Sequence, residues 1–106
     1  NDYLLKEAIY KEMSRDGQVY ILINNIETLN IEYDKLCKLV PDAKIGIAHG
    51  KMDKDSLNDI ISDFIDRKYD ILLCTTIIET GIDIPNVNTI TSQYQPFFWQ
   101  DQRYPL

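Results

Sequence analysis

Apolar residues follow two different spacings along this chain. Four short, mostly apolar runs predict buried β-strands at residues 18–24, 44–48, 70–76 and 87–90. Before and between the first three runs, apolar residues recur every three or four positions, which predicts amphipathic helices. Strands that alternate with helices favour an α/β fold with a mainly parallel sheet, helices on its faces and right-handed crossovers.

The predicted helices carry boundary signals. Residues that commonly cap a helix start stand before or at each one: Asp2, Asn25 and Asp53. Gly17 and Pro41 follow the predicted ends of the first two helices. Arg67 and Lys68 are predicted in the last turn of the third helix, where the helix dipole favours cations.

The same spacing predicts the core. The apolar stripe of the third helix consists of Leu57, Ile60, Ile61, Phe64 and Ile65. The residues expected to be mostly buried are Val19, Ile21, Ile23, Leu36, Ile45, Ile47, Ile61, Phe64, Ile71 and Leu73. Both cysteines, Cys37 and Cys74, are expected in the core because they stand within apolar patterns.

Composition narrows the function classes. The 106 residues carry a net charge of -6, which argues against non-specific nucleic-acid binding through bulk charge. Two cysteines and one histidine leave no basis for a disulfide framework or a zinc site. No apolar run reaches the roughly 18 residues of a membrane span, so we expect no membrane association. Two cysteines within apolar patterns fit a reducing cytosol, so we expect a cytoplasmic location.

The tail differs from the rest of the chain. Residues 91–106, TSQYQPFFWQDQRYPL, are rich in aromatic residues, and Pro96 and Pro105 oppose a regular central strand or helix. The shift in composition predicts a boundary between a domain over residues 1–90 and an aberrant tail of a different kind over residues 91–106.

Three loops follow the carboxyl ends of predicted strands, where open parallel sheets bind ligands: residues 24–26, 49–52 and 75–85. In the third loop, the hydroxyls of Thr75 and Thr76 suit a phosphate, and Gly81 permits close backbone approach. The alternative is that the threonines only end a β-branched strand, and composition alone favours that alternative. Gly50 and Lys51 do not form a Walker loop, because Met52 stands where that motif needs Ser or Thr.

Two longer motifs favour a functional role for the third loop over the alternative that its threonines only end a strand. AHGKM at 48–52 and DILLCTTIIETGIDIPNVNTI at 70–90 resemble the second RecA-like lobe of superfamily 2 helicases, in particular the bacterial transcription-repair coupling factors. The resemblance extends over roughly residues 4–90. Replication-fork helicases of the RecG or PriA kind are the alternative within the superfamily. A non-catalytic binding module that docks through its aromatic tail is the alternative outside it.

The resemblance implies an ATP-dependent double-stranded DNA translocase that acts on stalled RNA polymerase and recruits excision-repair proteins. It assigns DNA contacts to His49, Gly50, Thr75 and Thr76, nucleotide contacts to Gly81 and Asp83, and a coupling turn to Glu79 and Thr80. It implies ATP and Mg between this lobe and the first RecA-like lobe of the parent protein. Neither is expected to bind this fragment tightly.

The resemblance is incomplete in two respects that bear on catalysis, and it implies a lobe that is incomplete at its C-terminus. The phosphate loop and metal-binding carboxylates belong to the first lobe, and the family's arginine motif, Gln-x-x-Gly-Arg-x-Gly-Arg, is missing after residue 90. We therefore assign no catalytic residue and no metal ligand, and we expect no ATP hydrolysis by this chain. Its tail or an open sheet edge is expected to allow self-association.

Overall fold

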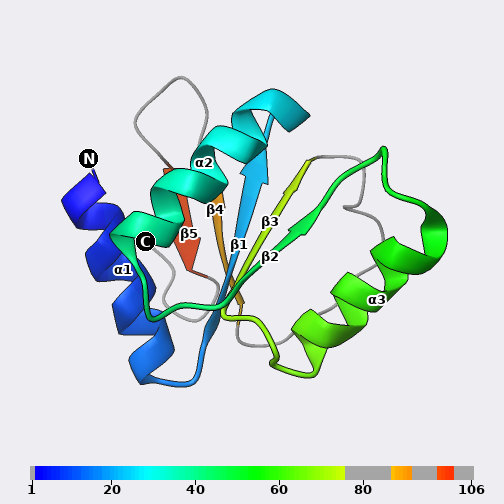
Figure 1. Cartoon of the computed structure of the whole chain (residues 1–106). Helices are drawn as coiled ribbons and strands as arrows, with labels where there is room; N and C mark the ends of the chain where they lie inside the picture. Colours follow the sequence, from blue (N-terminus) through cyan, green and yellow to red (C-terminus); the bar gives the residue numbers. More distant parts are fainter. Residues whose placement is uncertain (1, 76–86, 92–97, 102–106) are drawn as a thin grey trace.

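A computed structural model describes residues 2–75, 87–91 and 98–101 (Figure 1). Its helices and strands alternate along the chain in the predicted order. The elements are α1 (Asp2–Ser14), β1 (Gln18–Ile23), α2 (Ile26–Leu39), β2 (Ile45–Ala48), α3 (Lys54–Ile65), β3 (Ile71–Thr75), β4 (Val87–Thr91) and β5 (Phe98–Asp101). The four predicted strands are confirmed to within one or two residues at each end.

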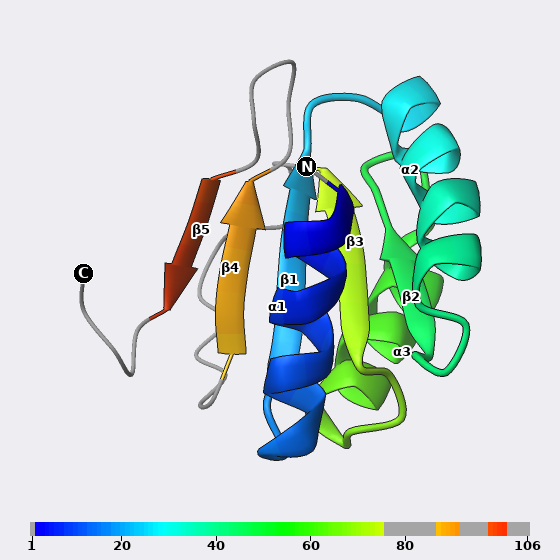
Figure 2. The ribbon, with the colours of Figure 1, turned by 90° about the vertical axis from the view of Figure 1, so that its left-hand side faces the viewer.

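The strands form one five-stranded sheet in the order β2-β3-β1-β4-β5 (Figure 2). β3 pairs in parallel with β1 on one side and with β2 on the other. β4 is also parallel to β1, and only β5, at the sheet edge, is antiparallel to its neighbour. The prediction of a mainly parallel sheet is therefore confirmed, and the described part of the tail, residues 98–101, forms the edge strand β5.

Helices pack on both faces of the sheet. Leu5 and Ile9 of α1 and Leu29 and Leu36 of α2 pack with alternate residues of β1 and β3, including Val19. The residues between those positions face the other way and pack against α3. Figure 1 shows α1 and α2 on one side of the strands and α3 on the other. Burial on both faces explains why the strand sequences are apolar runs rather than alternating patterns.

The start signals of α2 and α3 act as predicted. The Asn25 side chain accepts a hydrogen bond from the Thr28 backbone N–H at 2.8 Å. The Asp53 carboxylate accepts hydrogen bonds from the Ser56 N–H at 3.1 Å and the Ser56 hydroxyl at 2.7 Å. The bonds from the Thr28 and Ser56 backbone N–H groups satisfy donors that the first helical turn leaves without a partner, and the bond from the Ser56 hydroxyl adds to the cap of α3.

The first helix corrects the prediction for Asp2. Asp2 is the first residue of α1 rather than a cap before it. Its carboxylate forms an ion pair with Lys35 Nζ at 2.9 Å. This bond raises the pKa of Lys35, since it favours the charged ammonium. The side chain therefore joins α1 to α2 instead of capping α1.

The buried face of α3 is narrower than the apolar stripe in its sequence. Phe64 is completely buried, as predicted, whereas Ile61 is half-buried and Ile65 is 50% exposed. Ile45 and Ile47, on the edge strand β2, are also only half-buried. A helix buries the side chains that point at the sheet, and those on its flanks need further elements to cover them.

Two further predictions are wrong. Cys37 is exposed, because it lies next to the buried Leu36 on α2 and one residue step turns the side chain away from the sheet. Arg67 and Lys68 lie beyond the last turn of α3, which ends at Ile65. Arg67 has a positive φ of 66°, and its guanidinium donates a hydrogen bond to the carbonyl oxygen of Asp16.

In the part of the chain that the structure describes, no helix is both long enough and apolar enough to span a bilayer.

Candidate functional site

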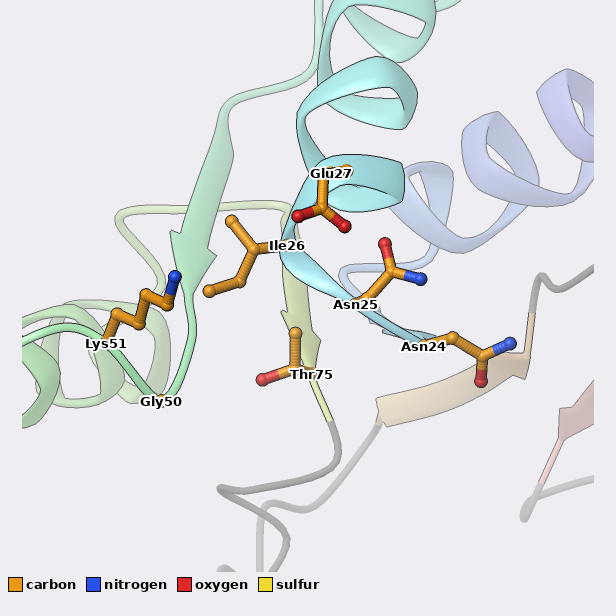
Figure 3. A pocket seen from close by; sticks show the side chains of 7 residues that line it. All are labelled: Asn24, Asn25, Ile26, Glu27, Gly50, Lys51 and Thr75. Carbon is orange, nitrogen blue, oxygen red and sulfur yellow. The ribbon is translucent and has the colours of Figure 1, made fainter.

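A cavity of about 410 Å³ opens at the carboxyl edge of the sheet (Figure 3). Three separate segments contribute its walls. The lining residues are Asn24, Asn25, Ile26, Glu27, Gly50, Lys51 and Thr75. They come from the loop after β1 and the start of α2, from the loop after β2, and from the last residue of β3.

The strand order explains why these segments meet. β3 lies between β1 and β2, and all three strands run in the same direction. Their carboxyl ends therefore meet at one edge, where open parallel sheets bind ligands. Thr75, at the end of β3, pairs with Ile23, at the end of β1.

The α2 side of the cavity combines a helix N-terminus with a carboxylate. Asn25 caps the helix, and Ile26 and Glu27 are its first two residues. The backbone N–H groups of a first helical turn carry partial positive charge and attract anions. The Glu27 carboxylate, which also lines the cavity, opposes a bound anion. Binding of an anion therefore depends on groups from the other two walls.

The opposite wall is the loop between β2 and α3. Lys51 is exposed and supplies an ammonium group on this side of the cavity (Figure 3). The carbonyl of His49 accepts a hydrogen bond from the Met52 N–H at 3.2 Å, which closes a turn. In addition, His49 Nδ1 accepts a hydrogen bond from the Lys51 N–H at 3.2 Å. Two bonds from one histidine therefore shape the loop that carries Gly50 and Lys51.

Thr75 lies at the base of the cavity. The residue is 8% exposed, and its hydroxyl points toward the Gly50 loop in Figure 3. The neighbouring Cys74 is completely buried, and this burial raises the pKa of its thiol to about 12. A thiol with that pKa stays protonated at neutral pH, so it is inert as a nucleophile. The polar chemistry at the end of β3 therefore rests on the Thr75 hydroxyl.

The structure describes three of the eight site residues that were predicted from the sequence. Gly50 and Thr75 line the same cavity, and His49 lies in the loop next to it. The remaining five lie outside the described residues: Thr76, Glu79, Thr80, Gly81 and Asp83. The roles assigned to all eight residues stay predictions, including the DNA contacts of His49, Gly50 and Thr75 and the nucleotide contacts of Gly81 and Asp83.

Five lining residues were not among the predicted site residues, although four of them stand in loops that the sequence placed at the correct edge: Asn24, Asn25, Ile26 and Lys51, with Glu27 as the fifth. Asn25 was predicted as a helix cap, and Lys51 stood in a candidate loop and in the AHGKM motif but was assigned no contact. Glu27 carried no signal, because a glutamate in a first helical turn is common for reasons of helix stability. Among the residues that the structure describes, no group of three or more His, Cys, Asp or Glu residues is arranged to hold a metal ion.

Comparison with curated proteins places these features in a family. The chain is 43% identical over all 106 residues to the transcription-repair-coupling factor of Staphylococcus epidermidis and spans 9% of that protein. It is 49% identical over 90 residues to the transcription-repair-coupling factor of Bacillus subtilis, which is 85% of this chain and 8% of the relative. The chain therefore spans less than a tenth of the length of these relatives.

Solved structures share the fold. The Hef helicase domain of Pyrococcus furiosus matches with a TM-score of 0.66 and 25% identity, over 90% of this chain and 20% of that one. A Dbp5 variant of S. cerevisiae, bound to RNA and ADP BeF3, matches with a TM-score of 0.65 and 29% identity, over 81% of this chain and 21% of that one. These likenesses confirm the predicted fold of a helicase C-terminal lobe.

A profile of the family described as "Helicase conserved C-terminal domain" matches residues 2–103, a range that runs past the boundary predicted at residue 90. The chain belongs to this family of helicase C-terminal domains.

Proposed function

We propose that this chain is part of an ATP-dependent double-stranded DNA translocase that acts on stalled RNA polymerase in transcription-coupled repair. In this proposal, the lobe holds a phosphate of the DNA backbone in the cavity at the carboxyl edge of the sheet. The family, and relatives named as transcription-repair-coupling factors, support the proposal. ATP and Mg bind between this lobe and a first RecA-like lobe elsewhere in the cytoplasmic parent protein.

One observation carries the DNA part of the proposal. Gly50, Lys51 and Thr75 line one cavity together with the first turn of α2. A phosphate accepts hydrogen bonds from hydroxyl and backbone N–H groups and pairs with an ammonium, and these walls contain all three kinds of group. Contacts of this kind recognise the DNA backbone without reading sequence, as a translocase that moves along any DNA requires.

The charge of the chain shapes the conditions of a test. With a net charge of -6, the chain as a whole repels DNA, so binding depends on local contacts in the cavity. A single lobe with few cationic contacts binds weakly. We therefore favour a titration of the ¹⁵N-labelled chain with a short DNA duplex, followed by NMR at low salt, because this method measures weak binding residue by residue.

The discriminating change is Thr75→Val, which removes the hydroxyl and keeps the shape of the side chain at the end of β3. A hydrogen bond to a charged group contributes about 1.5–3 kcal/mol, so we expect the duplex to bind at least about tenfold more weakly. The melting temperature is expected to change by less than about 5 °C, or ~1 kcal/mol.

Thr75→Ser is the matched control, because it keeps the hydroxyl and loses only a methyl group. We expect it to bind the duplex with nearly the affinity of the unaltered chain. If Thr75→Val binds as well as Thr75→Ser, the hydroxyl does not contact the phosphate. In that case Thr75 only ends a strand, and the result contradicts the proposal that the cavity binds a DNA phosphate through the Thr75 hydroxyl.

A further inference from the structure

The loop between β2 and α3 contains a histidine beside the cavity rather than in it. Within this loop, Gly50 and Lys51 line the cavity, whereas His49 does not. His49 is half-buried, and Gly50 and Lys51 are exposed. The resemblance assigned a DNA contact to His49 together with Gly50, but the geometry separates the two residues.

His49 uses one ring nitrogen within its own loop. Nδ1 accepts a hydrogen bond from the Lys51 N–H at 3.2 Å. A ring nitrogen accepts a hydrogen bond only when it carries no proton, so this bond requires the neutral tautomer with its proton on Nε2. The bond also occupies the Lys51 N–H, which leaves the Lys51 ammonium as the group of that residue that is available to an anion.

We propose that His49 is a positioning residue, whose Nδ1 holds the Lys51 N–H so that Gly50 and the Lys51 ammonium face the cavity. This proposal rests on the proposed phosphate site. The turn closed by the His49 carbonyl and the Met52 N–H exists without the imidazole, since it is a backbone bond. What the imidazole adds is a fixed orientation of the peptide between Gly50 and Lys51.

Three substitutions distinguish a role of the His49 Nδ1 atom from a role of its Nε2 atom. In His49→Asn, the side-chain oxygen takes the place of Nδ1, since Asn readily accepts a hydrogen bond from the N–H two residues later. In His49→Gln, the longer side chain places its amide near the position of Nε2 and leaves the Nδ1 position empty. His49→Ala removes both groups.

The first measurement concerns the loop itself. We expect hydrogen exchange of the Lys51 amide to be equally slow in the unaltered chain and in His49→Asn. In His49→Gln and His49→Ala, the exchange is expected to be about 2- to 10-fold faster, as for the loss of one neutral hydrogen bond. A long-range ¹H–¹⁵N spectrum of the unaltered chain is expected to show the His49 proton on Nε2. Unchanged amide signals of Ile71 and Leu73 verify that each variant keeps the sheet.

The second measurement is NMR titration of the same four proteins with a short DNA duplex. We expect His49→Asn to bind within about 2-fold of the unaltered chain, and His49→Gln and His49→Ala to bind about 2- to 10-fold more weakly. The rescue by Asn is the decisive result, because a direct phosphate contact through Nε2 predicts the opposite order.

The possible failures are distinguishable. If His49→Gln keeps its affinity for the duplex and His49→Asn loses it, His49 contacts DNA directly. That result overturns the positioning proposal and leaves the proposed DNA site intact. Equal affinity in all four proteins overturns positioning alone. If the duplex shifts no amide of the unaltered chain, the phosphate site fails, and the positioning proposal fails with it.

Discussion

Replacing Phe64 by Ala tests the packing of α3 on the sheet. Phe64 is completely buried and packs with three other buried residues, Ala48, Leu72 and Cys74. This cluster is the smaller of the two cores, and α3 is the helix that contributes to it. The phenyl ring is the largest side chain in the cluster's buried set, so its loss removes much of what holds α3 in place.

The magnitude follows from two terms. Burial of a Phe side chain contributes about 1.5–3 kcal/mol through removal of apolar surface from water. The cavity left by truncation adds a further cost, and Phe→Ala changes in cores total about 3–5 kcal/mol. A domain of this size is stable by about 5–15 kcal/mol, so the variant loses a large fraction of its stability. The melting temperature should fall by more than about 10 °C.

Urea unfolding followed by circular dichroism measures this loss, with Ile65→Ala as the matched control. Ile65 lies on the same helix, next in sequence to Phe64, but is 50% exposed. Ala also has a higher helix propensity than Ile, so we expect the control to change stability by no more than about 1 kcal/mol. Equal losses in the two variants would refute the packing of α3 described above.

Two further predictions concern ionisable groups. The hydrogen bonds from Ser56 hold the pKa of Asp53 below its ordinary value. The Asp53 carboxylate therefore stabilises the fold at a pH above its unfolded-state pKa. This stabilisation is lost as the pH falls through its folded-state pKa. Urea midpoints from about pH 5 to about pH 2 should therefore fall more steeply for the unaltered chain than for Asp53→Asn, which caps without titrating; parallel curves would contradict the assignment. Iodoacetamide at about pH 8 should alkylate Cys37 and leave Cys74 intact until the chain is denatured, because burial raises the pKa of Cys74 to about 12. Peptide mass spectrometry checks this, and modification of Cys74 in the native chain would show that β3 is not buried.

Local signals predicted the elements well, because the forces that decide them act within a few residues. Asn25 and Asp53 cap helices through bonds to residues three positions later, so their role is visible in the sequence. The apolar runs of β1, β2 and β3 were equally clear, since burial on both faces of the sheet leaves few polar positions in them. Asp2 was misjudged because its partner, Lys35, lies on another helix.

Periodicity predicted the direction of each buried stripe but not its width. Ile61 and Ile65 share the apolar character of Phe64, yet of these three residues only Phe64 is buried. Cys37 follows Leu36 directly, and one residue step on a helix separates a buried position from an exposed one. The width of a buried stripe depends on which elements lie beside the helix, and that information is not local.

The candidate site was predictable as an edge but not as a set of side chains. Parallel strands bring their carboxyl ends together, which is why the three loops could be selected from the sequence. Which residues face one cavity depends on the position of β3 between β1 and β2. Lys51 and Glu27 line the cavity through that arrangement; the AHGKM motif contains Lys51 without assigning it a contact, and no motif contains Glu27.

The strand order also has a consequence for how the chain folds. β3 is the last of the three strands to be synthesised, yet it separates β1 from β2 in the sheet. All five of its residues are buried, and its alternate side chains belong to the two opposite cores. A nascent chain that ends before β3 therefore has two strands that cannot pair with each other and two apolar faces that cannot close. Pairing between segments so distant in sequence slows folding. Both cores and the carboxyl-edge cavity therefore depend on β3 lying between β1 and β2, so a chain without β3 completes none of the three.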